Sequence, residues 1–221
     1  MINMFSTILF DLDGTLTDPG EGITNSVAYA LERFGIHVND RKSLYPFIGP
    51  PLTDSFSRYY GMTDSQATEA VKVYREYFSV KGWLENCPYD GIDTMLSHLQ
   101  RSGKRLLVAT SKPEEFAVRI LEYFGLSTYF EIICGAPFNP PKGHGKADVI
   151  KDALKRAGIF DLDGVIMVGD RRHDVQGAHA VGIPAVGVLY GYGDREEHEA
   201  CQADYIVEDI NNLEELLLGE A

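Results

Sequence analysis

Polar side chains that could carry chemistry stand at the ends of several short apolar runs in this sequence. They are Asp11, Asp13 and Thr15 after the first run, Thr110, Ser111 and Lys112 after a second, Lys142 and Lys146 in the loop after a third, and Asp170 and Asp174 after a fourth. If these runs are parallel strands, their carboxyl ends meet at one edge of the sheet, where open α/β sheets bind ligands. We therefore expect these carboxylates, hydroxyls and a lysine to converge there.

This combination of residue types suits phosphoryl transfer. Several carboxylates at close range repel one another, and their pKa values rise unless a cation lies between them. Oxygen ligands without histidine or cysteine suit a hard cation, and Mg²⁺ is the ion we expect. One aspartate can attack phosphorus to give an aspartyl-phosphate, while a second carboxyl group protonates the leaving oxygen and later activates water. A hydroxyl and a lysine can bind the other phosphoryl oxygens, where charge spreads in the transition state.

The elements that must position these residues are short strands alternating with helices. Brevity and branched side chains favour strands over helices in six runs: Ser6–Phe10, Arg105–Ala109, Glu131–Cys134, Val165–Gly169, Ala185–Leu189 and Tyr205–Val207. Amphipathic patterns between them predict helices, such as the one over Ala147–Ala157 that Gly158 terminates. This alternation predicts an α/β fold, a parallel sheet flanked by helices on both faces.

The alternation fails between the first strand and the one near Arg105, where only helical patterns occur. Asp18-Pro19 precedes one amphipathic helix, and Thr63 with Gln66 forms a capping box that opens another. A structureless loop of this length is uncommon inside a compact domain. The sequence therefore predicts an all-helical insertion over residues 19–86, with residues 1–18 and 87–221 forming the catalytic core.

One five-residue pattern occurs twice, in two different contexts. Phe10–Gly14 follows a predicted strand, whereas the same letters at Phe160–Gly164 follow a helix and precede a strand. The second copy should therefore lie at the opposite edge of the sheet. We interpret it as a polar turn without a role in chemistry.

Four motifs in order along the chain resemble those of the haloacid dehalogenase-like (HAD) phosphohydrolase superfamily. They are Phe10-Asp11-Leu12-Asp13-Gly14-Thr15-Leu16, then Thr110, then Lys146, and finally Gly169-Asp170-Arg171-Arg172-His173-Asp174. Residues 47–52 and 187–193 are most similar to the branch of phosphoglycolate phosphatases and bacterial 5′-nucleotidase-like enzymes. The resemblance implies a Rossmann-like core with a helical cap that closes over the substrate.

The resemblance also implies roles for the carboxylates. Asp11 would be the nucleophile and Asp13 the general acid and base. Mg²⁺ would be held by the Asp11 carboxylate, the Asp13 backbone carbonyl and Asp170, with Asp174 as a further ligand. A carboxylate at residue 13 separates this chain from the dehalogenases, which lack it, and from transport ATPases, which carry threonine there.

Phosphate binding is assigned in the same way to Thr110, the Ser111 backbone and a lysine that steadies the aspartyl-phosphate. The family's usual Lys-Pro pairing is absent here, which leaves Lys142 and Lys146 as candidates. We select Lys146 because it immediately precedes a predicted helix, where the family places this lysine.

Composition limits the partners. The formal net charge of −13 repels polyanions at long range, so we expect a small phosphorylated metabolite and no nucleic acid polymer. No apolar run reaches the roughly 20 residues of a membrane span, and no secretory signal is evident. The three cysteines form no CxxC pair and indicate neither disulfides nor zinc. We expect a cytoplasmic enzyme that is a monomer or a weak homodimer.

The predicted function is a Mg²⁺-dependent phosphatase acting on a small phosphomonoester, with 2-phosphoglycolate or a 5′-nucleotide as leading substrates. Sugar phosphates and phosphotyrosine are further candidates. A phosphomutase of the same fold, similar to β-phosphoglucomutase, shares every motif above. A phospho-receiver domain or a non-catalytic binding protein is a rival of another class, although receivers lack a helical insertion after the first strand.

Overall fold

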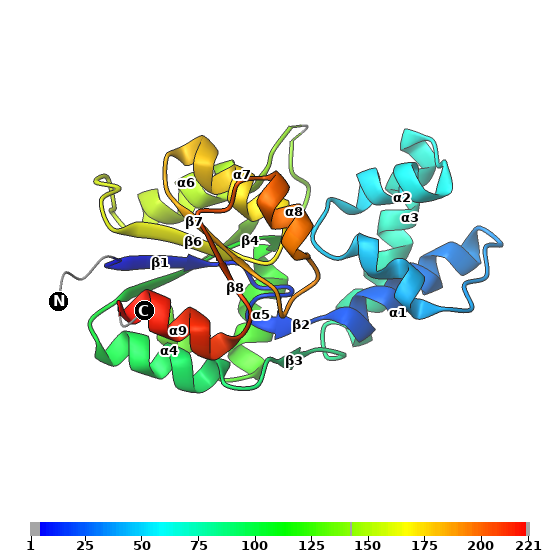
Figure 1. Ribbon diagram of the computed structural model, residues 1–221. Coiled ribbons are helices and arrows are strands. Elements are labelled where there is room, and N and C mark those ends of the chain that lie inside the picture. The colour runs from blue at the N-terminus through cyan, green and yellow to red at the C-terminus, as the bar shows by residue number, and fades with distance from the viewer. Residues whose placement is uncertain (1–4, 142, 220–221) are drawn as a thin grey trace. The chain divides into compact units, whose positions relative to one another are not determined.

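The computed structural model describes residues 5–141 and 143–219, and its largest element is a parallel sheet (Figure 1). The strands lie in the order β5-β4-β1-β6-β7-β8, and every adjacent pair is parallel. Their bounds are β1 Thr7–Phe10, β4 Arg105–Pro113, β5 Ile132–Ala136, β6 Val165–Gly169, β7 Ala185–Val188 and β8 Tyr205–Val207. The predicted α/β fold is thereby confirmed. It agrees with the six predicted strands, of which β4 extends past the expected end.

Helices cover both faces of this sheet (Figure 1). On one face lie α6 (Lys146–Arg156) and α7 (Arg172–Val181), and on the other lie α4 (Ile92–Arg101), α5 (Glu114–Tyr123) and α9 (Ile210–Leu218). A short 3₁₀ turn, Ser127–Tyr129, precedes β5, and α8 (Arg195–Ala200) follows β7.

The core on the α6 and α7 face is built from alternate residues of the central strands. Leu9 stands in register with Leu107 and Met167, and all three are fully buried with Ile150 of α6 and Val175 of α7. Burying a side chain of this size contributes roughly 1.5–3 kcal/mol. Central strands fixed in this way provide a rigid base for whatever follows their carboxyl ends.

The strand order reverses at β1, which is the feature that locates the site. From β1 the chain proceeds to β4 and β5 on one side, then returns to β6, which pairs with the opposite edge of β1. Helices that run in opposite directions from such a switch point leave a crevice beyond the carboxyl ends of the two strands. The residues that follow β1 and β6 therefore face one another there.

The second compact unit, residues Asp18–Cys87, is all helical. It contains α1 (Gly20–Arg33), a 3₁₀ helix (Arg41–Phe47), α2 (Leu52–Tyr60), α3 (Asp64–Tyr77) and a π-helical turn (Phe78–Gly82). The expected capping box opens α3: the Gln66 backbone N–H donates to Thr63 Oγ1 at 3.3 Å, and the Thr63 N–H donates to Gln66 Oε1 at 3.0 Å. Short strands β2 (Thr17–Asp18) and β3 (Cys87–Pro88) stand at the two chain crossings. The assignment of this unit as a substrate cap stays a prediction.

The second copy of the five-residue pattern is a surface turn, as expected. It directly precedes β6, and the ring of Phe160 is 84% exposed. The Gly164 carbonyl accepts from the backbone N–H groups of Ser6 and Thr7 at the start of β1. Asp161 and Asp163 thus lie at the edge of the sheet opposite to Asp11 and Asp13. Among the helices described, none combines the length and the apolar character needed to cross a membrane.

Candidate active site

A tight loop after β1 carries the first two aspartates. The Asp11 N–H still bonds to the sheet, donating to the Val168 carbonyl of β6 at 2.9 Å. The chain then turns so sharply that the Leu12 carbonyl accepts from the backbone N–H groups of Leu16 and Thr17 at 2.9 and 3.0 Å. Asp11 is therefore fixed by the strand, and Asp13 is presented by the turn.

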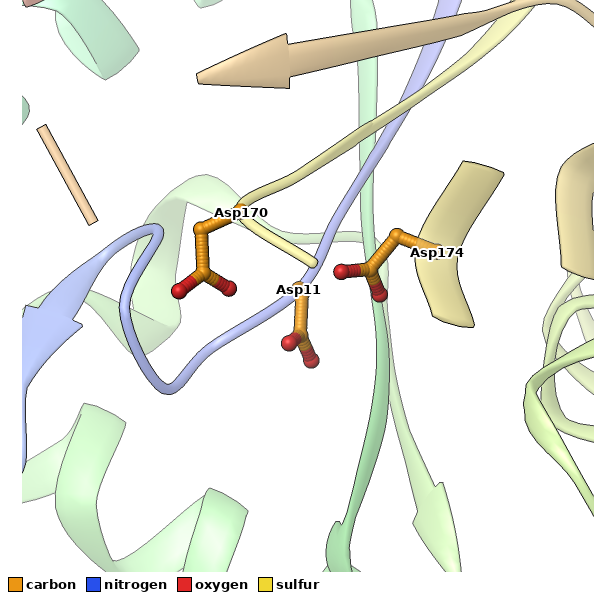
Figure 2. Close-up of side chains that lie close together, drawn as sticks. All are labelled: Asp11, Asp170 and Asp174. Carbon is orange, nitrogen blue, oxygen red and sulfur yellow. The ribbon is translucent and has the colours of Figure 1, made fainter. Parts of the chain in front are cut away.

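Three aspartates from β1, β6 and α7 form a buried cluster (Figure 2). One carboxylate oxygen from each of Asp11, Asp170 and Asp174 lies within 4.8 Å of the other two, and the side chains point toward one another. All three residues are at most 5% exposed. Burial raises the pKa of Asp174, and the nearby charge of Asp11 raises it further, against the opposing effect of Lys146. Such a cluster needs positive charge to stay ionised.

Lys146 provides part of that charge from the first residue of α6. Its Nζ lies 2.8 Å from Asp11 Oδ1 and 2.6 Å from Asp174 Oδ1, and it donates to the Ala109 carbonyl of β4 at 2.9 Å. These contacts account for the three hydrogens of an ammonium group. Burial opposes the charge of Lys146, but the two carboxylates outweigh it and raise the pKa of the amine. The structure thus brings Lys146 to the cluster, while the alternative, Lys142, lies outside the described residues.

Asp170 occupies a niche bounded by glycines. A Cβ atom at Gly14 would stand 2.0 Å from Asp170 Oδ2, and one at Gly191 or Gly193 would also overlap Asp170. The Tyr192 N–H donates to Oδ2 at 2.8 Å, whereas Oδ1 is buried and has no hydrogen-bond partner among the described residues. Burial raises the pKa of Asp170 well above its usual value, and Asp174 and Asp11 raise it further. A buried carboxylate oxygen without a partner is a natural ligand for a cation.

Asp174 has a structural task as well. Its Oδ2 accepts from the Arg171 N–H at 3.1 Å and so caps α7, while its Oδ1 faces Lys146. Glu197 of α8 fixes the same turn, accepting from the Arg172 N–H at 2.8 Å and from Arg171 Nε at 3.0 Å. The turn between Asp170 and Asp174 is thereby held from two sides.

The end of β4 places the expected phosphate-binding residues beside this cluster. Thr110 is buried, and its hydroxyl oxygen accepts from the Lys112 N–H at 3.2 Å, whereas the side chain of Ser111 is exposed. Lys112 itself has no role in the sequence-based prediction. Its Nζ lies 2.7 Å from Asp13 Oδ2 with both side chains largely buried. Burial raises the pKa of the Asp13 carboxyl group, and Lys112 opposes that effect.

The donor set fits a magnesium ion. Mg²⁺ takes oxygen ligands, commonly one or two carboxylates, and the cluster presents three from buried aspartates. The free Oδ1 of Asp170 gives the ion an anchoring position, and Lys146 supplies only part of the compensating charge.

The chain matches the model of the family described as haloacid dehalogenase-like hydrolase over residues 8–188, and it belongs to this family. A 5′-nucleotidase of Pseudomonas aeruginosa is 43% identical over 213 residues, covering 96% of this chain and 96% of that protein. The crystal structure of a predicted phosphatase from Clostridium acetobutylicum has a TM-score of 0.93 and 46% identity, covering 98% of this chain and 99% of that one. The expected family and enzyme class, a hydrolase of phosphoric monoesters, are thereby confirmed.

A relative with a different name is also similar. Tyrosine-protein kinase PtkA of Mycobacterium tuberculosis is 43% identical over 186 residues, covering 84% of this chain and 62% of that protein. The fold and the motifs are therefore shared by proteins whose names describe different phosphoryl-transfer activities.

The glycine niche leads to a first prediction. Gly14→Ala places a methyl group at the Asp170 carboxylate on a backbone with φ of +84°. We expect kcat/KM for p-nitrophenyl phosphate to fall about 10²-fold, the scale of a misplacement of about 1 Å in a catalytic group. Gly103→Ala is the matched control, because Gly103 has a φ of +78° with open space around it. It should share the backbone cost of about 1–2 kcal/mol in thermal unfolding and retain activity. Equal activity in both variants would contradict the role of the niche.

Proposed function

We propose that this chain hydrolyses a small phosphomonoester through an aspartyl-phosphate on Asp11 with the help of Mg²⁺. The observation that carries the proposal is the environment of Asp11: a strand-anchored carboxylate with Oδ1 2.8 Å from the Lys146 ammonium, beside two further buried carboxylates. A carboxylate held in place by the sheet and by an ammonium is oriented for attack at a single point.

Two chemical steps follow from this arrangement. In the first, an Asp11 oxygen bonds to phosphorus as the bond from phosphorus to the leaving oxygen breaks, and Asp13 gives that oxygen its proton. In the second, Asp13 takes a proton from water while the water oxygen bonds to phosphorus and the Asp11–phosphorus bond breaks. Inorganic phosphate leaves, and both aspartates return to their starting states.

Asp11, the Asp13 backbone carbonyl and Asp170 would hold the ion. When bound, Mg²⁺ would neutralise charge on the phosphoryl oxygens and among the aspartates. Asp174 fits an outer position better, because its Oδ1 lies 2.6 Å from Lys146 and its Oδ2 caps α7. Thr110, the Ser111 backbone and Lys146 would bind the phosphoryl oxygens.

For the substrate, we propose a 5′-nucleotide first and 2-phosphoglycolate second. The 5′-nucleotidase of P. aeruginosa supports this order, since it covers nearly the whole of both chains. The test is a phosphate-release screen with Mg²⁺ over 5′-nucleotides, 2-phosphoglycolate, sugar phosphates and phosphotyrosine, ranked by kcat/KM. Release from nucleotides at least about tenfold above the rest supports the order. Sugar-phosphate isomerisation without phosphate release would instead identify a phosphomutase.

The nucleophile can be tested with a control built into the sequence. Asp11→Asn should lower kcat by more than about 10³-fold, the scale of losing a nucleophile, with the fold retained. Asp161→Asn makes the same change in the second copy of the pattern, on the exposed turn before β6, and should leave kcat unchanged. Wild-type turnover in Asp11→Asn would refute an aspartyl-phosphate on this residue.

Removing divalent cations should also stop turnover. Excess chelator removes the charge that offsets the buried carboxylates and the phosphate, so phosphate release should fall to background and return when Mg²⁺ is added back. Isothermal titration should show Mg²⁺ binding that Asp170→Asn weakens. Full activity in excess chelator would show that the ion is not required.

A further inference from the structure

The ion pair between Lys112 and Asp13 joins two segments that are far apart in the sequence. Lys112 Nζ lies 2.7 Å from Asp13 Oδ2, and the two side chains are only 5% and 11% exposed. One comes from the turn after β1, the other from the end of β4, which pairs with β1. An exposed pair of this kind contributes little, whereas a buried one holds both partners in a defined geometry.

The backbone around Lys112 is fixed from two directions. Its N–H donates to Thr110 Oγ1 at 3.2 Å, and the pairing of β4 with β5 shifts register between Thr110 and Pro113. On the other side, a Cβ at Gly135 of β5 would stand 2.6 Å from the Lys112 carbonyl oxygen. Only a glycine allows the two strands to approach this closely. The ammonium group is therefore delivered to Asp13 by a rigid irregularity of the strand.

The two oxygens of Asp13 are in different situations. Oδ2 faces the Lys112 ammonium, while Oδ1 is buried and has no hydrogen-bond partner among the residues described. An ammonium group offers donors and no acceptor, so it occupies Oδ2 as an acceptor. Oδ1 is left as the oxygen that can exchange a proton with a reacting group.

We propose that Lys112 is a positioning residue, which holds Asp13 by Oδ2 so that Oδ1 serves as the general acid and base. The proposal rests on the proposed function, in which Asp13 protonates the leaving oxygen. The two buried lysines would then have separate tasks: Lys146 steadies the nucleophile Asp11, and Lys112 aims the proton donor. Loss of Lys112 should affect the reaction most where the leaving group most needs a proton.

The test is a leaving-group series. Alkyl phosphates depart as poor leaving groups and depend on a proton donor, whereas p-nitrophenyl phosphate departs readily without one. Lys112→Met should lower kcat/KM for alkyl phosphates about 10- to 100-fold, part of the usual contribution of general acid catalysis, and change it less than about threefold for p-nitrophenyl phosphate. Lys112→Arg, which keeps the charge, should restore most of the alkyl phosphate activity. In the Asp13→Asn background, Lys112→Met should cause no further loss, because residues that act through one another are not additive.

Lys104→Met is the matched control, since Lys104 is a second buried lysine next to the start of β4, where its Nζ donates to the Phe5 carbonyl. It should leave the leaving-group dependence unchanged. An equal loss across the series in Lys112→Met, or a rise in KM alone, would overturn the positioning role in favour of a structural or substrate-binding one. If Lys112→Met does not fold, Lys112→Gln replaces it in the same comparison. A leaving-group-selective loss in Asp13→Asn but not in the Lys112 variants refutes only this inference. No selective loss in Asp13→Asn refutes the proposed function and the inference together.

Discussion

The compensation of buried negative charge by Lys146 is the constraint on which the site depends. Its ammonium group contacts Asp11 after β1, Asp174 of α7 and the Ala109 carbonyl of β4. Removing an ion from water costs several kcal/mol, so aspartates this deeply buried require a matching charge at short range. Because the contacts come from three elements, the same interaction that keeps the carboxylates ionised also fixes the spacing of β1, β4 and α7. Electrostatics and architecture are therefore coupled at this edge of the sheet.

The rest of the site follows from the parallel sheet. Strand order reverses at β1, so the turns after β1 and β6 oppose one another, and Asp11 and Asp170 meet without any contact between neighbours in sequence. The hydrogen bond from the Asp11 N–H to β6 and the capping role of Asp174 leave these side chains little freedom. Reactive groups held this way require little reorganisation when charge develops on a phosphoryl group.

Much of this could be predicted from the sequence, and the exceptions have physical reasons. Strand ends are visible as apolar runs followed by polar residues, so Asp11, Thr110 and Asp170 could be placed at one edge. The capping box of α3 was visible because both partners lie within four residues. Lys112 stands in the same list of strand ends, yet its pairing with Asp13 depends on a register shift in β4, which leaves no local pattern. The glycine niche was hidden for the same reason: a glycine shows that space is needed, but not which side chain occupies it.

That niche affects how losses of activity in this protein should be interpreted. Gly14, Gly191 and Gly193 bear no reactive group, yet each is in contact distance of Asp170 and admits no larger residue without displacing it. A saturation mutagenesis map would mark all three as intolerant, as it would mark the aspartates. For the aspartates the intolerance reports chemistry, and for the glycines it reports volume. Only a comparison of folded stability with turnover, position by position, separates the two kinds of essential residue.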